Sequence, residues 1–185
     1  MRSKSLAAPL AIALTIPFAT VNTAEAEILP DCVRAAATAN LDAKTQYQRD
    51  LRDLIVTQRP EFEALATINQ DLQIGLAQSR RAKYDYLLDH DRERIDTSNG
   101  ISRFSNFRWS LTENENFKAD DSSYRDLEAR VDGLQEQSTD HPDWPALREF
   151  FRAVLRPSPL SADLIEGLVT RQGEIAATLK NCQRE

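Results

Sequence analysis

The segment PSPLSADLIEGLVTRQGEIAATLKNC, residues 157–182, repeats its core-type positions at alternating steps of three and four. Such spacing places side chains on one face of an α-helix, and Ser158 or Ser161 stands where a capping hydroxyl is preferred. The stripe consists of Ile165, Leu168, Gln172, Ile175, Leu179 and Cys182. Because the stripe ends in Cys182, the segment predicts a last helix whose core-facing side carries a cysteine able to form a disulfide.

The chain contains two cysteines, Cys32 and Cys182, one near each end of the sequence. In a chain with an exporting leader, this pair favours a single disulfide, and free or intermolecular thiols are the alternative. Closing so long a loop removes on the order of 5 kcal/mol of unfolded-chain entropy in the simple model. The bridge would place the last helix antiparallel to the first and leave neither sulfur for catalysis or metal binding.

Residues 1–26 have the features of a cleaved signal peptide. Arg2 and Lys4 precede an apolar run, and the segment ends in Ala24-Glu25-Ala26, a pattern that suits signal peptidase. A retained N-terminal anchor is the competing interpretation, although the apolar run is shorter than the roughly 20 residues that span a bilayer. We therefore expect a bacterial protein of the periplasm, or one that is fully secreted.

Residues 27–185 are expected to form a single helical domain. The leader removes two basic residues and one acidic residue, so the net charge changes from −6 to −7. Acidic and basic residues are interspersed without a basic cluster, which argues against nucleic acid and anionic lipid as partners. No further segment is apolar enough to cross a membrane, so no membrane span is expected after signal cleavage.

Helical spacing continues upstream, and strand signals are absent. A first helix from Val33 should end near Gln58, because Pro60 suits the first turn of a second helix that runs to about Ile95. Three shorter helices should follow from Asp121 onward. We therefore predict an all-α bundle of about five helices, closed by one disulfide. The side chains expected to face the core are Val33, Ala37, Leu41, Lys44 (by its stem), Tyr47, Leu51, Leu54 and Ile55 in the first helix, and Phe62, Leu65, Ile68, Leu72, Leu76, Tyr84, Leu87 and Leu88 in the second.

Residues 96–120 are expected to be irregular. They include SNGISRFSNFRWSLTENENF, residues 98–117, in which aromatic residues are mixed with asparagine and serine. A connection of this length is usually functional or disordered, and its aromatic content argues against disorder. One interpretation is a lid of rings folded over the open end of the bundle. The other is a binding surface, because aromatic residues with arginine are typical of interface hot spots. The candidate binding residues are Arg103, Phe104, Phe107, Arg108 and Trp109.

The chemistries common in helical bundles each lack an obligatory residue. The sequence after the leader has no methionine, no haem-attachment motif, no paired Glu-x-x-His, no zinc ligand set and no phosphate-binding loop. Glu113 and Glu115 could form a glycan-cleaving pair, but a glycosidase needs two carboxyl groups facing each other across a cleft. No catalytic residue, metal or cofactor is therefore assigned.

Three carboxylates recur every four residues at Asp85, Asp89 and Glu93. Hard cations need convergent oxygen ligands, which a single straight helix does not supply. Ion pairs with Arg81 and Arg92 on a solvated helical face are therefore favoured over a divalent-cation site.

The segment INQDLQIGL, residues 68–76, resembles the Ile-Asn-x-Arg-Leu segment of the secreted all-helical chorismate mutases, which share the size, export, helical content and disulfide of this chain. The likeness covers fewer than a dozen residues, and Asp71 stands where that family has a substrate-binding arginine. The resemblance implies a small enzyme that holds an anionic substrate between cationic side chains. Arg80, Lys83 and Arg103 are the candidates for that clamp.

The absence of catalytic signatures favours a non-catalytic, exported binding protein of the inhibitor, immunity, adaptor or assembly-factor class. Its expected partner is another periplasmic protein or peptide, or a cell-wall glycan. The alternative is the small periplasmic enzyme, acting on an anionic small molecule. An enclosed cavity lined by convergent cations would favour the enzyme, and an exposed contiguous patch would favour the binding protein.

Overall fold

The computed structural model describes residues 27–95, 97, 107–154 and 159–184. These residues contain six α-helices, two 3₁₀-helices and two strands of two residues each. The all-α bundle closed by one disulfide is confirmed. The leader and its expected cleavage point lie outside the described residues.

The N-terminal half consists of two long helices joined by a tight turn. Strand β1, Glu27–Ile28, precedes α1, Pro30–Gln58, which has proline in its first turn. The 3₁₀-helix η1, Pro60–Phe62, separates α1 from α2, Glu63–His90, so the expected break at Pro60 is present. A second 3₁₀-helix, η2, covers Arg92–Arg94.

The described residues of the C-terminal half form four helices and the second strand. They are α4, Leu111–Asp120; α5, Ser122–Asp140; α6, Trp144–Val154; α7, Pro159–Lys180; and β2, Gln183–Arg184. None of the described helices is both long enough and apolar enough to pass through a bilayer.

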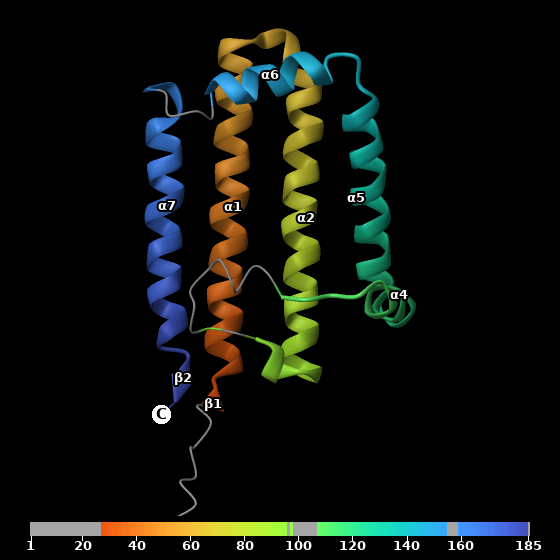
Figure 1. Ribbon diagram of the computed structural model, residues 1–185, viewed down its shortest axis with the longest axis vertical. Helices are drawn as coiled ribbons and strands as arrows, with labels where there is room; N and C mark the ends of the chain where they lie inside the picture. Colours follow the sequence, from red (N-terminus) through yellow and green to blue (C-terminus); the bar gives the residue numbers. More distant parts are fainter. Residues whose placement is uncertain (1–26, 96, 98–106, 155–158, 185) are drawn as a thin grey trace, which may run out of the picture.

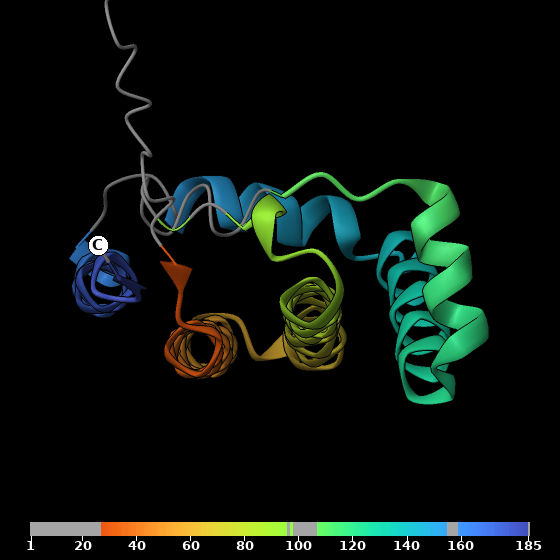
Figure 2. The same ribbon diagram turned by 90° about the horizontal axis from the view of Figure 1, so that it is seen from below.

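The long helices α7, α1, α2 and α5 lie side by side in a row (Figure 1), and the view from below shows the same order (Figure 2). Helix α1 contacts both α2 and α7, and α2 also contacts α5. Helix α6 crosses one end of the row, while α4 lies beside α5 at the other end. Helices α1 and α2 therefore form the middle of the row.

The two ends of the domain are tied together. A disulfide joins Cys32 to Cys182 with their Cα atoms 5.4 Å apart, and Cys182 is fully buried. Strands β1 and β2 pair antiparallel beside this bond, and the Leu29 N–H donates to the Cys182 carbonyl at 2.8 Å. Helix α7 thus returns antiparallel to α1, as the position of the cysteine on its apolar stripe predicts.

The core has two parts. One lies between α1, α2 and α7 at the disulfide end, and its members include Val33, Leu87 and Leu179, each fully buried. The other lies under α6, where Leu147 packs with Ile55 and side chains of η1 and α2. Helix α6 therefore covers the end of the row that is remote from the disulfide.

Several details of the sequence prediction are wrong. Helix α2 ends at His90 rather than near Ile95, because the Arg92 side chain donates to the Leu88 carbonyl at 2.7 Å and satisfies the helix end. Leu76, expected in the core, is 43% exposed. The strand pair at the termini was not expected at all.

Residues 111–120 form a helix inside the segment expected to be irregular. The reason is a capping box: the Ser110 hydroxyl accepts from the Glu113 N–H at 3.2 Å, and the Glu113 carboxylate accepts from the Ser110 N–H at 2.7 Å. These reciprocal bonds satisfy the first free N–H groups of α4 and start it directly after Trp109.

Gly75 allows α5 to approach α2 closely. A Cβ atom added at this position would lie 2.8 Å from Val131 Cγ2, closer than real Cβ contacts. Helix α5 carries residues that fix one end of the candidate site, so this approach contributes to the geometry of that site.

Candidate functional site

A trough of about 490 Å³ runs across α2 between α1, α7 and the segment that precedes α4. This volume lies within the usual range for small-ligand sites, roughly 300–1,000 Å³. Among the described residues the trough is open on one side rather than enclosed. Its lining consists of Lys44, Tyr47 and Gln48 from α1, Gln73, Leu76, Ala77, Ser79, Arg80 and Lys83 from α2, Phe107 and Trp109, and Leu168 and Gln172 from α7.

Three cationic side chains line the trough: Lys44, Arg80 and Lys83. Among the described residues, no carboxylate oxygen lies within 4.0 Å of the charged groups of Lys44 or Arg80. Burial, and secondarily the charge of Arg80, lowers the pKa of Lys44. Burial also lowers the pKa of Lys83, although Glu128 opposes that shift from 3.8 Å. Lys44 and Arg80 therefore bring positive charge to the trough that no carboxylate among the described residues neutralises.

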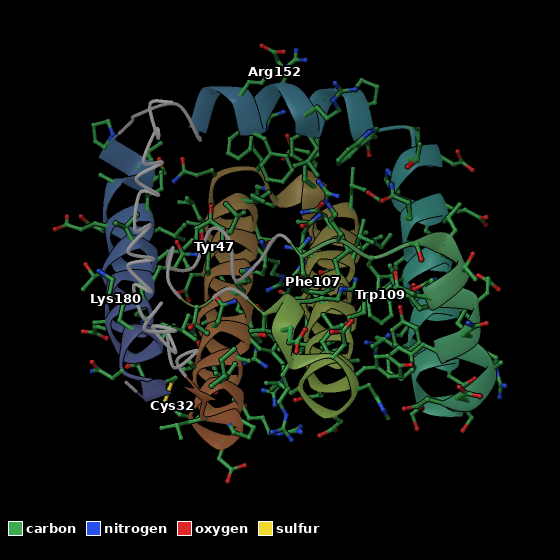
Figure 3. The ribbon with its side chains drawn as sticks, turned by 60° about the horizontal axis from the view of Figure 1, so that its bottom comes forward. Cys32, Tyr47, Phe107, Trp109, Arg152 and Lys180 are labelled. Atoms are coloured by element: carbon green, nitrogen blue, oxygen red, sulfur yellow. A yellow bond between two sulfur atoms is a disulfide. The ribbon has the colours of Figure 1, made fainter. Side chains whose placement is uncertain are left out.

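Two aromatic rings stand beside these cations. Phe107 meets Tyr84 edge to face with 5.1 Å between ring centroids, and Trp109 meets Tyr86 in the same way at 5.6 Å. Both rings are only half-buried, so they pack on α2 and also present a surface to the trough. Figure 3 shows Phe107 and Trp109 next to α2, with Tyr47 on α1. For Phe107 and Trp109, packing on the bundle and presenting a binding surface are therefore compatible roles.

A hydrogen-bonded network fixes Trp109 at one end of the trough. The Trp109 indole N–H donates to Asn114 Oδ1 at 3.1 Å, and the Tyr124 hydroxyl donates to the same oxygen at 2.5 Å. Asn114 Nδ2 in turn donates to Glu128 at 3.3 Å, and Glu128 also accepts from the Ser79 hydroxyl at 2.5 Å. Since Asn114 belongs to α4 and Glu128 to α5, both helices hold the ring in place.

The carboxyl group of Glu128 remains ionised in this network. Burial acts to raise its pKa, but the hydrogen bond from Ser79, the charge of Lys83 and the hydrogen bonds with Asn114 and Tyr124 together outweigh burial, and the net shift is downward. A carboxylate with a lowered pKa is a weak general base. Glu128 therefore positions Ser79 and Lys83 rather than activating them.

The residues predicted as a binding surface do not all come together. Phe107 and Trp109 line the trough, whereas Arg108 is exposed and does not; its carbonyl accepts a hydrogen bond from Arg94. Arg103 and Phe104 lie outside the described residues. The candidates Arg80 and Lys83 from the alternative, enzymatic interpretation do lie together in the trough.

Sequence reasoning missed Lys44 and Gln172 as site residues. Both occupy positions on the predicted core-facing stripes of α1 and α7, and both line the trough instead. A polar side chain on an otherwise apolar stripe was the available signal. In the segment that resembles chorismate mutases, Asp71 is exposed and lies outside the trough, while Gln73 and Leu76 line it.

Two of the three carboxylates of the acidic helical face, Asp85 and Asp89, are paired with arginine, and Glu93 lies in η2, beyond the end of α2. Asp85 accepts from Arg81 at 2.9 Å and from Arg34 of α1 at 3.1 Å, and Asp89 also pairs with Arg34. The predicted pair with Arg81 is confirmed. The partner expected in Arg92 is wrong, because Arg34 reaches across from the neighbouring helix. No group of three side chains able to hold a metal ion occurs among the described residues.

Glu113 and Glu115 do not form a glycosidase pair. The hydrogen bonds from Ser110, followed by the contact with Arg94, lower the pKa of Glu113 to about 2. A glycosidase acid requires the opposite, a raised pKa. Glu115 pairs with Lys118 at 3.3 Å on the surface of α4. Both carboxylates therefore serve the helix that holds Trp109.

Comparison of the chain with protein-family models, with curated proteins and with solved structures finds no match.

Proposed function

We propose that this chain is an exported, non-catalytic binding protein whose trough takes a ligand or partner that carries negative charge. The observation that carries the proposal is the pairing of Lys44 and Arg80, two cations without a carboxylate partner among the described residues, with the half-exposed rings of Phe107 and Trp109. An anion supplies the missing charge, and the rings supply apolar contact area.

A binding role without catalysis is supported by the composition of the trough. None of its described lining residues is Asp, Glu, His or Cys, so the lining offers a ligand no carboxylate, imidazole or thiol. Ser79 is the one lining serine, and its hydroxyl donates to the ionised Glu128. The inhibitor, immunity, adaptor and assembly-factor roles all suit such a trough when the partner presents an acidic group.

Export is part of the proposal. The leader ending at Ala26 suits signal peptidase, and the bond between Cys32 and Cys182 is consistent with an oxidising compartment. A periplasmic or secreted location fits both features. Cell fractionation with the leader intact tests this part separately.

The binding test uses the fluorescent anion anilinonaphthalene sulfonate, which combines a negative charge with aromatic rings. A Lys44→Gln/Arg80→Gln variant should bind the probe about tenfold more weakly or worse, because two charge-assisted contacts are lost. The matched control is Arg148→Gln/Arg152→Gln, which removes two exposed positive charges from α6, where Figure 3 shows Arg152 pointing outward. Equal probe affinity in the two variants would rule out the trough as the binding site.

The same trough favours a second candidate, the small enzyme that clamps an anionic substrate. Lys44, Arg80 and Lys83 are the cations that would form the clamp. The openness of the trough among the described residues favours the binding protein, since catalytic sites usually exclude water. Incubation with chorismate, followed by product analysis, decides between the two. Turnover that disappears in Lys44→Gln/Arg80→Gln protein would replace the non-catalytic proposal.

A further inference from the structure

A small pocket opens from the floor of the trough between α1 and α2. It has a volume of about 20 Å³ and shares Lys44, Ala77 and Arg80 with the trough. Its full lining is Ala37, Asn40, Leu41, Lys44, Ala77, Arg80, Arg81 and Tyr84. Since a water molecule needs roughly 10–15 Å³ on this measure, the pocket has room for one or two water-sized groups.

Asn40 lines this pocket and carries an unpaired polar atom. Its side chain belongs to a residue only 8% exposed, and its Oδ1 atom is buried without a hydrogen-bond partner among the described residues. Buried polar groups in folded proteins nearly always have partners, so an unpaired one at a pocket indicates a missing ligand or water. A half-turn of the amide would present its NH₂ donors to the pocket instead of the oxygen.

The charge around Asn40 is positive. Arg81 is neutralised by Asp85, to which it donates at 2.9 and 3.0 Å. Lys44 and Arg80 have no such partner within the described part of the chain. The pocket therefore combines two uncompensated cations with an amide that can donate, which is a donor set for an anion rather than for a cation.

The rings of the trough begin directly beside the pocket. Tyr84 lines the pocket, and Phe107 packs on Tyr84 with 5.1 Å between centroids. Leu76, Trp109 and Leu168 continue the apolar surface along the trough. A ligand whose charged group occupies the pocket would thus lay its apolar part against these side chains.

We infer that the pocket at Asn40, Lys44 and Arg80 is a subsite for a carboxylate, and that the ligand is an organic carboxylate with an apolar or aromatic tail lying in the trough. The inference rests on the proposed function and specifies its ligand. A planar carboxylate places two oxygens in a space of one or two water-sized groups, whereas a phosphonate or sulfonate needs more room. The carboxylate can belong to a free organic acid or to the C-terminus of a peptide that ends in an apolar residue.

Isothermal titration of the oxidised protein compares ligands that differ only in the head group. Phenylpropionate should bind at least about tenfold more tightly than phenylpropanamide, which lacks the charge, and more tightly than phenylethylphosphonate, which is larger. The peptide acetyl-Ala-Ala-Phe, with a free or an amidated C-terminus, distinguishes the two sources of the carboxylate. If the free peptide binds more tightly than phenylpropionate, the source is a peptide C-terminus; the reverse order identifies a free acid.

The variant Asn40→Leu keeps the size of the side chain and removes its amide. It should weaken phenylpropionate binding about tenfold while leaving the affinity for anilinonaphthalene sulfonate within twofold, since the sulfonate occupies the trough and not the pocket. Asn40→Asp is the second variant; it keeps the shape, pairs with the neighbouring cations and should repel the carboxylate. Circular dichroism confirms that each variant is folded.

The outcomes separate the two proposals. Equal affinities for phenylpropionate and phenylpropanamide, or undiminished phenylpropionate binding in both Asn40 variants, would overturn the carboxylate subsite. The trough proposal would still stand in that case if the Lys44→Gln/Arg80→Gln protein lost affinity for the sulfonate probe. Loss of neither ligand in that double variant would overturn both proposals.

Discussion

Replacement of Gly75 by alanine should separate α2 from α5. The new Cβ would lie 2.8 Å from Val131 Cγ2, whereas carbon atoms in contact prefer about 3.5–4.0 Å. One helix must therefore move by roughly 1 Å, or Val131 must leave its preferred rotamer, which is stiff because its side chain is β-branched. Overpacking of this kind typically costs about 1–3 kcal/mol.

The net effect is smaller than the overlap cost, because alanine is the better helix former. Gly75 lies inside α2, where its replacement by alanine alone would contribute up to about 1 kcal/mol of stability. Gly133, inside α5, supplies the matched control, since nothing lies within 4 Å of a Cβ added there. Gly133→Ala should show only the gain, and Gly75→Ala should be about 1–3 kcal/mol less stable than Gly133→Ala.

Guanidinium unfolding of the oxidised domain, followed by far-ultraviolet circular dichroism, measures these differences. Val131→Ala removes the clashing methyl group, so the Gly75→Ala/Val131→Ala protein should show a coupling of at least about 0.5 kcal/mol. Separation of α2 from α5 should also increase the mobility of Trp109, because Glu128 of α5 anchors its network. If Gly75→Ala were as stable as Gly133→Ala, the reasoning about this helix contact would be refuted.

Three further predictions concern covalent and electrostatic stability. Cys32→Ser/Cys182→Ser protein should lose up to about 5 kcal/mol of unfolding free energy, because the bond closes a loop across 150 residues of sequence separation, and a loss below about 1 kcal/mol would contradict the chain-entropy account. Glu113→Gln should lower the thermal midpoint at pH 7, because the folded-state pKa of Glu113, about 2, lies below the usual 4.5. The difference from wild type should vanish as the pH falls from 4.5 to about 2, and a difference that does not depend on pH would be inconsistent with this cause. Lys44→Met keeps the aliphatic stem and removes the ammonium group, whose pKa is lowered from 10.5 by burial and by Arg80. The substitution should therefore raise the unfolding free energy at pH 7 by about a few tenths of a kcal/mol, and this gain should shrink as pH rises toward 10.5. A loss of stability at neutral pH would argue against uncompensated charge at this position.

The fold follows from local patterns to a large extent. The stripe that ends in Cys182 predicts the last helix, because helical periodicity is a local property of the sequence. The return of that helix to Cys32 was predictable because the chain has two cysteines, one near each end. The order of helices in the row is different, since it depends on contacts between distant segments. Gly75 and Gly133 look alike in the sequence, yet only Gly75 faces a neighbouring helix closely.

The site was harder to predict because its residues come from separate helices. Aromatic content identified Phe107 and Trp109, and both line the trough. The sequence analysis assigned the aliphatic part of Lys44 to the core. The spacing of three and four residues does not indicate whether another helix or an open trough lies against that face of α1. The helix at 111–120 was missed because its low apolar content hides it, although Ser110 and Glu113 form a recognisable capping box.

The pKa of the Lys44 amino group, measured by NMR with and without phenylpropionate, tests most directly whether an anion binds at the uncompensated cations. In the free protein this pKa should lie below 10.5, because burial and Arg80 disfavour the charged form. A bound carboxylate should raise it, since a neighbouring negative charge favours the ammonium ion. An unchanged or further lowered pKa at saturating phenylpropionate would contradict the account.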